Sequence, residues 1–426
     1  MIKFALKGGE PEAAAMDVVA REPHIAPVPR ISIQAFCTTP ETAAAMQAAS
    51  EDRRMAKAHL KIQMGGTVAA VEAYRSSPTP NVIIIESDGR ADDLLNGLDS
   101  LAEVCDAGTR VIAIGYLNDI VLYRELVRRG VSDYLMAPVD TLGIIGAVSG
   151  LFHAPDSKPV GRTVAVVGAK GGVGASTVAH NIAWSIARDL GLDAVVADLD
   201  LPFGTAGLDF NQDPPQGIAD AVSSPDRIDV AFVDRLLSKC TDHLSLLAAP
   251  ATLERVYDLG AESFDAIFDV LRSTAPCIVL DVPHVWTGWS KRTLISADDI
   301  LVVATPDLAN LRNTKNLVDL LRAARPNDQA PLYCLNQVGV PKRPELKAGD
   351  FTKALEAAPI ASIPFEPQIF GTAANNGQMI AEVSSGNRLA ETFRQIGQQL
   401  TGRSEGKRSR VSLLSPLLEK LVRRQG

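Results

Sequence analysis

A glycine-rich segment, Ala169-Lys170-Gly171-Gly172-Val173-Gly174-Ala175-Ser176-Thr177, contains the residues of this chain best suited to binding a phosphate. It lies between an apolar stretch that predicts a strand, 163–167, and a stretch of helical character, 178–187. Glycines let successive backbone N–H groups face one anion, and the N-terminus of the following helix adds partial positive charge. The segment therefore predicts a nucleotide-binding loop formed by Gly171, Gly172, Val173, Gly174, Ala175, Ser176 and Thr177.

This loop departs from the common pattern G-x-x-x-x-G-K-[ST] at two positions. Ala169 replaces the first glycine, and Ala175 replaces the lysine that contacts the β- and γ-phosphate oxygens. The lysine of the loop, Lys170, comes five residues earlier. Loss of a fixed donor of this kind removes on the order of 2–4 kcal/mol of transition-state stabilisation. We therefore expect weak or absent ATP hydrolysis.

Acidic residues follow two further predicted strands and complete the pattern of a nucleotide site. Asp281 ends the apolar stretch 277–280, and together with the Ser176 hydroxyl it suits Mg²⁺. Asp200 closes the D-x-D segment after the stretch 194–197, where a carboxylate can orient a water near the γ-phosphate. In this order along a β-α-β pattern, the three segments predict binding of ATP or GTP with Mg²⁺.

From about residue 162 to 400 the chain resembles the MinD/ParA family of P-loop ATPases, whose deviant loop reads K-G-G-V-G-x-[ST]-T. The resemblance implies ATP as the nucleotide and a sandwich homodimer in which Lys170 reaches the partner's nucleotide. It also implies that Asp200 positions the attacking water. Asn336 would then read the adenine, and Pro364 would lie beside the base.

The first part of the chain shows its own alternation of strands and helices, which predicts a second parallel sheet. Its segment 130–138 resembles the corresponding segment of response-regulator receiver domains. The phosphotransfer residues are replaced, because Glu86 stands where the phosphoacceptor aspartate would be and Ala137 where the lysine would be. A receiver-like domain used for protein contacts or dimerisation is therefore favoured over a working phosphorylation switch.

The fold class expected from these patterns is α/β, with two doubly wound parallel-sheet domains. The predicted organisation is a disordered leader 1–29, an atypical receiver-like domain 30–153, a linker 154–161, a MinD/ParA-like ATPase domain 162–402 and a basic amphipathic tail 403–426. The tail combines lysines and arginines with leucines at near-helical spacing, so that a solvated tail, a partner-binding helix and a membrane-binding helix all stay open.

Composition narrows the class of protein and its compartment. The 426 residues include 42 basic and 50 acidic side chains, so the net charge of −8 gives no general reason to expect nucleic-acid binding. The five cysteines and six histidines are scattered without the spacing of zinc ligands, which is typical of reduced thiols in the cytoplasm. No apolar stretch approaches the ~18 residues of a membrane span. We expect a cytoplasmic protein, with any contact at the inner membrane or cell pole being peripheral.

An atypical receiver followed by K-G-G-V-G-A-S-T is similar to the CpaE/TadZ group, as is the segment D-L-D-L-P-F-G at 198–204. This resemblance implies a nucleotide-promoted homodimer that localises or assembles the secretion machinery of Flp-type (tight adherence) pili. A MinD-like division-site regulator and a ParA-like DNA partitioning ATPase remain alternatives. Partitioning would require a basic surface, for which the candidates are Arg322, Arg325, Lys342, Arg343 and Lys347.

Overall fold

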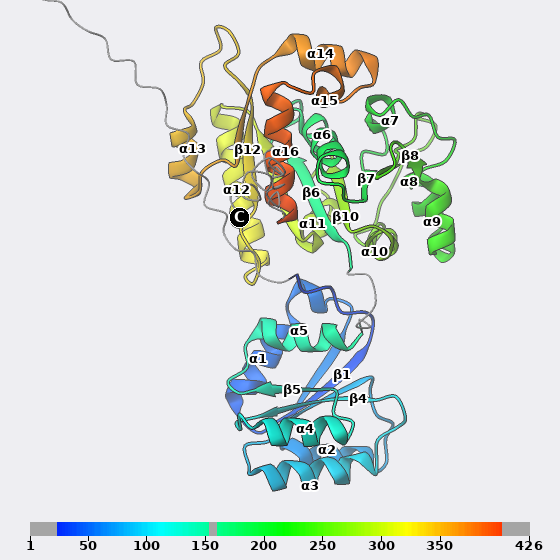
Figure 1. The fold of residues 1–426 in the computed structure, drawn as a ribbon, viewed down its shortest axis with the longest axis vertical. Coiled ribbons are helices and arrows are strands. Elements are labelled where there is room, and N and C mark those ends of the chain that lie inside the picture. The colour runs from blue at the N-terminus through cyan, green and yellow to red at the C-terminus, as the bar shows by residue number, and fades with distance from the viewer. Residues whose placement is uncertain (1–23, 153–159, 403–426) are drawn as a thin grey trace, which may run out of the picture.

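The computed structural model describes residues 24–152 and 160–402, which form two α/β domains arranged one above the other (Figure 1). The predicted tail 403–426 and most of the predicted leader and linker lie outside the described residues. Residues 24–29, which the sequence assigns to the leader, pack against the folded domains: Val28 is 1% exposed and its N–H donates to the Arg54 carbonyl at 2.8 Å.

The receiver-like domain is built on a five-stranded parallel sheet in the order β2-β1-β3-β4-β5. Helices α1 and α5 cover one face of this sheet, and α2, α3 and α4 cover the other. Apolar side chains fill both faces of β3, as expected for a central parallel strand. The strands are β1 (Ser32–Cys37), β2 (His59–Met64), β3 (Val82–Glu86), β4 (Arg110–Gly115) and β5 (Asp133–Met136), and the helices are α1 (Pro40–Ser50), α2 (Gly66–Tyr74), α3 (Ala91–Ala102), α4 (Ile120–Arg128) and α5 (Thr141–Leu151).

Glu86, at the end of β3, lies where a receiver domain would carry its phosphoacceptor. Its carboxylate accepts hydrogen bonds from the backbone N–H of Thr38 and Thr39, and from the hydroxyls of Thr39, Thr42 and Tyr116, all within 2.9 Å. Burial on its own would raise the pKa of Glu86, but the Thr39 and Thr42 hydrogen bonds lower it overall. An anionic carboxylate bound by five donors already occupies this position.

The second domain contains an eight-stranded sheet in the order β13-β12-β11-β6-β10-β7-β9-β8. The seven-strand run from β13 to β9 is parallel, as predicted, and the two-residue edge strand β8 pairs antiparallel with β9. The strands are β6 (Arg162–Gly168), β7 (Ala194–Asp198), β8 (Ser238–Lys239), β9 (Leu244–Leu247), β10 (Cys277–Val282), β11 (Asp299–Ala304), β12 (Leu332–Val338) and β13 (Ala361–Pro364).

Helices cover both faces of this sheet and make it a doubly wound fold. One apolar layer lies between one face of the sheet and the helices from α8 through α13. The other layer lies between the opposite face and α6, α14, α15 and α16, with the short α7 at its border. The helices are α6 (Ala175–Arg188), α7 (Ala206–Asp209), α8 (Ile218–Val222), α9 (Val230–Leu236), α10 (Asp265–Thr274), α11 (Gly288–Ser296), α12 (Leu308–Ala324), α13 (Ala348–Leu355), α14 (Pro367–Asn376), α15 (Ile380–Val383) and α16 (Arg388–Thr401). Among these described helices, none has the length and apolar composition needed to cross a bilayer.

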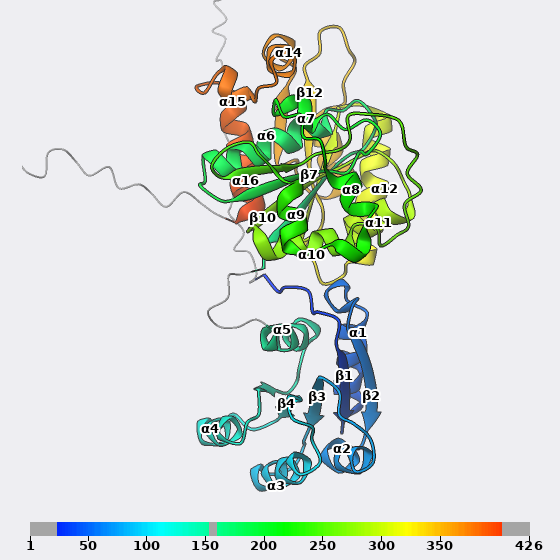
Figure 2. The same ribbon diagram turned by 90° about the vertical axis from the view of Figure 1, so that its right-hand side faces the viewer.

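The two domains meet at the amino ends of their strands. The contact residues of the first domain precede β1 and β2, and those of the second precede β10, β11 and β12. The carboxyl ends of the two sheets therefore point in opposite directions, away from the junction (Figures 1 and 2).

A buried cluster of charges holds this junction. Arg53 donates to Asp328 at 2.7 Å and to Asp298 at 3.3 Å, and Arg272 donates to Asp298 at 2.8 Å. Arg54 bonds the other oxygen of Asp328. These side chains are between 2% and 9% exposed, so each charge depends on its partners for stabilisation.

Replacing Arg53 by methionine should destabilise the chain by about 3 kcal/mol, because Asp298 and Asp328 lose a buried partner while the apolar volume is kept. Guanidinium denaturation measures this change. Arg128→Met is the matched control: Arg128 pairs with Glu125 at the surface, where its side chain is 73% exposed, and its replacement should leave the stability almost unchanged. An equal effect of the two variants would contradict a structural role for the cluster.

The junction should also weaken in acid. Burial on its own would raise the pKa of Asp298, but Arg272, His24 and Arg53 hold it well below its ordinary value. A carboxylate with a depressed pKa in the folded state contributes stability above its unfolded pKa of about 3.9 and loses it as the pH falls further. Asp298→Asn should therefore flatten the pH dependence of unfolding below about pH 4, measured by denaturation at stepped pH.

Candidate nucleotide site

The glycine-rich loop connects β6 to α6 at the carboxyl edge of the second sheet. Gly172 and Gly174 have φ of 80° and 81°, a left-handed conformation that favours glycine. A Cβ at Gly174 would lie 2.6 Å from Asn336 Nδ2, so this position has neither the space nor the backbone conformation for another residue. Gly174 is the N-cap of α6, and the helix N-terminus opens directly onto the loop.

Side chains from three other elements bind the carbonyls of the loop. Asn313 Nδ2 donates to the Ala169 carbonyl at 2.8 Å, Asn336 Nδ2 to that of Val173 at 2.8 Å, and Gln337 Nε2 to that of Gly172 at 3.1 Å. His284 Nδ1 lies 2.9 Å from the Gly168 carbonyl. With these carbonyls bound, the peptide dipoles of the loop are fixed, which suits binding of an anion. Among these four residues, the sequence predicted a role for Asn336 alone. The predicted role was contact with the adenine base, and the structure shows a hydrogen bond to the loop.

Two carboxylates lie side by side at the same edge of the sheet. Asp198 of β7 and Asp281 of β10 are register partners on adjacent strands, and they are 0% and 4% exposed. Asp198 accepts the N–H groups of Asp200 and Ala206, both at 3.1 Å. Burial, and next the charge of Asp281, raise the pKa of Asp198 to about 7. This concentration of negative charge fits a cation site.

His180, fully buried on α6, lies between two aspartates. Its Nδ1 is 2.7 Å from Asp209 Oδ2, and its Nε2 is 3.3 Å from Asp281 Oδ2. Burial on its own would lower the pKa of His180, but Asp209 and Asp281 raise it to about 10. The sequence interpretation treated His180 as isolated. One of its partners, Asp209, lies 29 residues further along the chain, and the other, Asp281, lies on strand β10.

The remaining predicted residues gather around this edge. Lys170 is exposed, and its charge contributes to lowering the pKa of Asp307, which burial on its own would raise. Asp200 is half-buried, accepts the N–H of Phe203 at 3.2 Å, and has a pKa that burial raises. Ser176 is half-buried in the first turn of α6, and Pro364 ends β13, the strand beside that of Asn336.

The predicted Mg²⁺ ligands are Ser176 and Asp281. Hydroxyl and carboxylate oxygens are the donors that Mg²⁺ prefers, and the Asp198–Asp281 pair supplies the negative charge that such an ion neutralises. Within residues 24–152 and 160–402, no group of three or more His, Cys, Asp or Glu side chains could hold a metal ion. A hydroxyl and a carboxylate fit an Mg²⁺ ion whose other ligands would be the phosphates of a nucleotide and waters.

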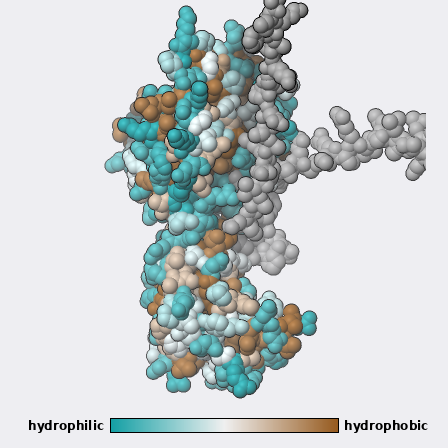
Figure 3. Space-filling view, turned by 90° about the vertical axis from the view of Figure 1, so that its left-hand side faces the viewer, coloured by the Kyte–Doolittle hydropathy of each residue, from teal (hydrophilic) through white to brown (hydrophobic). Residues whose placement is uncertain are grey.

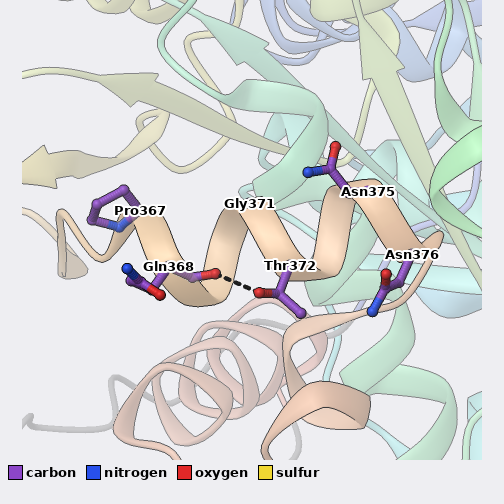
Figure 4. Close-up of a pocket in the computed structure, with 6 residues that line it drawn as sticks. All are labelled: Pro367, Gln368, Gly371, Thr372, Asn375 and Asn376. Carbon is purple, nitrogen blue, oxygen red and sulfur yellow. Dashed lines mark hydrogen bonds between the residues drawn. The ribbon is translucent and has the colours of Figure 1, made fainter.

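A separate hollow of about 450 Å³ lies along one face of α14 (Figure 4). Its lining comes from this helix, and the drawn side chains carry amides and a hydroxyl but no charge. A phosphate would find no cation there, so the glycine-rich loop is the better candidate for nucleotide binding. The lining residues are Pro367, Gln368, Gly371, Thr372, Asn375 and Asn376.

Comparison with known proteins gives matches to both parts of the chain, although no family model matches it. A crystal structure of the pilus assembly protein CpaE from Caulobacter crescentus is 49% identical, with a TM-score of 0.30; the match covers 31% of this chain, at its N-terminal part, and 100% of that chain. MinD from Pyrococcus horikoshii, solved with Mg-ADP, is 18% identical with a TM-score of 0.50, over 56% of this chain and 95% of that chain. MinD from Synechocystis is 28% identical over 164 residues, or 38% of this chain; the match spans 60% of that relative's length.

The doubly wound sheet and its glycine-rich loop give this domain the MinD/ParA-type P-loop fold. The 49% identity over the whole of the Caulobacter chain extends the relationship to the receiver-like domain. The protein belongs to the CpaE family of pilus assembly proteins.

Replacing Asn336 by alanine should remove the hydrogen bond to the Val173 carbonyl and loosen the loop. We expect a stability loss of about 1 kcal/mol and a roughly tenfold loss of ATP affinity, equal to about 1.4 kcal/mol. Denaturation and titration calorimetry measure the two effects. Gln337→Ala is the control, because Gln337 bonds the same loop at the exposed surface and should change neither quantity appreciably.

Proposed function

We propose that this chain is an ATP-dependent switch: it binds ATP and Mg²⁺ at the glycine-rich loop, dimerises through the carboxyl edge of its ATPase sheet, and thereby localises or assembles the secretion machinery of Flp-type pili. Ala175 leaves the site without the usual phosphate lysine, so hydrolysis is weak or absent. Membership of the CpaE family and the Mg-ADP bound to the P. horikoshii MinD support the pilus role and the nucleotide respectively.

The observation that carries this proposal is an exposed apolar rim around Lys170. Large apolar side chains lie exposed in the segments that follow β7, β9, β10, β11 and β13, at the same edge as the loop. Val256 is 99% exposed and Leu308 72% exposed. Exposed apolar surface of this kind marks a protein contact. The rim consists of Phe203, Leu208, Leu253, Val256, Val285, Trp286, Leu308 and Phe365.

The rim suits a second copy of the same edge. A two-fold contact is self-complementary, so one apolar rim can cover another, and the exposed Lys170 of each copy then faces the other copy's loop. The receiver-like domain lies at the opposite end of the ATPase sheet and leaves this edge open (Figure 1).

The DNA partitioning alternative loses part of its proposed basic surface. Arg325 is 4% exposed and bonds Asp328 in the domain junction, and Arg343 is paired with Glu345. Three of the five candidate cations therefore remain, Arg322, Lys342 and Lys347.

Lys170→Ala should abolish the nucleotide-promoted dimer, because the cation that would reach the partner's nucleotide is lost. Light scattering with and without ATP measures the mass. Lys315→Ala is the matched control: Lys315 is an exposed lysine of α12 that pairs with Asp319, and its loss should leave the dimer intact. Failure of the wild type to bind ATP at millimolar concentration would refute the proposed function.

Ala175→Lys should raise ATP turnover by on the order of 10²-fold or more, because it restores a fixed cation beside the transferred phosphate. A phosphate-release assay on both proteins measures this, and we expect wild-type turnover far below once per second. Rapid wild-type turnover would contradict the switch. In cells that carry Lys170→Ala as the sole copy, sheared surface pilin should fall to background, and unchanged pilin would contradict the pilus role.

A further inference from the structure

Helix α7, the short helix after β7, is tied to the buried carboxylate pair at both of its ends. At its first residue, the Ala206 N–H donates to Asp198 Oδ2 at 3.1 Å. At its last residue, Asp209 Oδ2 lies 2.7 Å from His180 Nδ1, and His180 Nε2 lies 3.3 Å from Asp281 Oδ2. Each of the two neighbouring carboxylates thus has its own connection to α7.

The same helix carries part of the apolar rim. Leu208 is 72% exposed and directly precedes Asp209. Phe210, which follows Asp209, packs against the His180 ring with 5.4 Å between ring centroids. A movement of Asp209 relative to His180 therefore moves Leu208 at the rim as well.

We propose that His180 is a positioning residue that connects the candidate metal ligand Asp281 to α7, so that loading of the nucleotide site changes the position of the rim. This inference rests on the proposed function for its nucleotide-dependent part. His180 approaches the same carboxylate that Mg²⁺ would use. An ion bound at Asp281 would compete for the carboxylate oxygen that His180 Nε2 approaches at 3.3 Å, and the contact of His180 with Asp209 at 2.7 Å would then remain.

Packing alone does not account for this arrangement. An apolar ring in place of His180 would fill the same space against Phe210, but it would leave Asp281 and Asp209 without their shared partner. The two roles therefore predict different results when His180 is replaced. A positioning role predicts a change in the Mg²⁺ concentration that ATP binding requires, and a packing role predicts no change.

The test uses His180→Asn and Asp209→Asn in the full chain, with hydrogen exchange of residues 204–212 followed by mass spectrometry. Without nucleotide, both variants should raise exchange in this segment at least tenfold and leave the exchange of α12 unchanged. This part does not depend on ATP binding. Unchanged exchange at 204–212 in both variants would overturn the proposal, even where the proposed function holds.

The second readout is the Mg²⁺ requirement of ATP binding, measured with a fluorescent ATP analogue. His180→Asn should lower the half-saturating Mg²⁺ at least fivefold, because a side chain that competes for the Asp281 carboxylate is removed. It should also abolish the change in exchange at 204–212 that ATP and Mg²⁺ produce in the wild type. An unaltered Mg²⁺ requirement would leave His180 as a packing residue and overturn the proposal.

His243→Asn is the matched control, since His243 forms a histidine–aspartate pair of the same 2.7 Å length with Asp193 at the surface. It should change neither readout. If His180→Asn fails to fold, Asp209→Asn keeps the buried histidine and still removes the connection to α7. If the wild type binds no ATP, the proposed function fails, and the nucleotide-free exchange still decides the role of His180.

Discussion

Two carboxylates placed side by side in a buried sheet impose the main constraint on this molecule. Asp198 and Asp281 face each other in register on adjacent strands, where burial makes both charges costly. N–H groups from the segment after β7 bond Asp198, and His180 of α6 lies 3.3 Å from Asp281. The carboxylate pair therefore connects α6 and the chain after β7 to the carboxyl edge of the sheet.

A second charge cluster, at the opposite end of the ATPase sheet, fixes the receiver-like domain. Asp298 and Asp328 precede β11 and β12, and they take arginines from both domains. Burial makes these pairs geometrically demanding, so the junction favours one orientation of the domains over others. On the receiver-like domain, five donors bind the Glu86 carboxylate. This carboxylate occupies the position at which a receiver domain would carry its phosphoacceptor.

Much of the fold followed from local patterns. The apolar runs at 163–167 and 277–280 predicted strands, and the glycine loop predicted its own strand-loop-helix context, because neighbouring residues determine these features. Contacts between distant residues could not be obtained in this way. Arg53 and Asp328 are 275 residues apart, and Asn336 and Val173 are 163 apart, with no periodicity to link them.

The same limit explains the errors of assignment at individual residues. His180 lies on the expected helix, but its importance depends on Asp209 and Asp281, which reach it only in the folded chain. Arg325 was expected from the sequence to be a surface cation, but it is buried in the structure and bonds Asp328 at the domain junction. A predicted cation in the sequence therefore says little about whether its charge is available to a ligand.

The opposed directions of the two sheets have a consequence for reach. A chain joined to a second copy at the carboxyl edge of its larger sheet would carry its two receiver-like domains at the far ends of an elongated particle. Apolar surface is exposed on the receiver-like domain (Figure 3), and on α4 the exposed apolar residues include Ile120 and Val121. Such a particle is bivalent. A particle with two copies of one surface would gain avidity only for an array whose binding sites match the span between them.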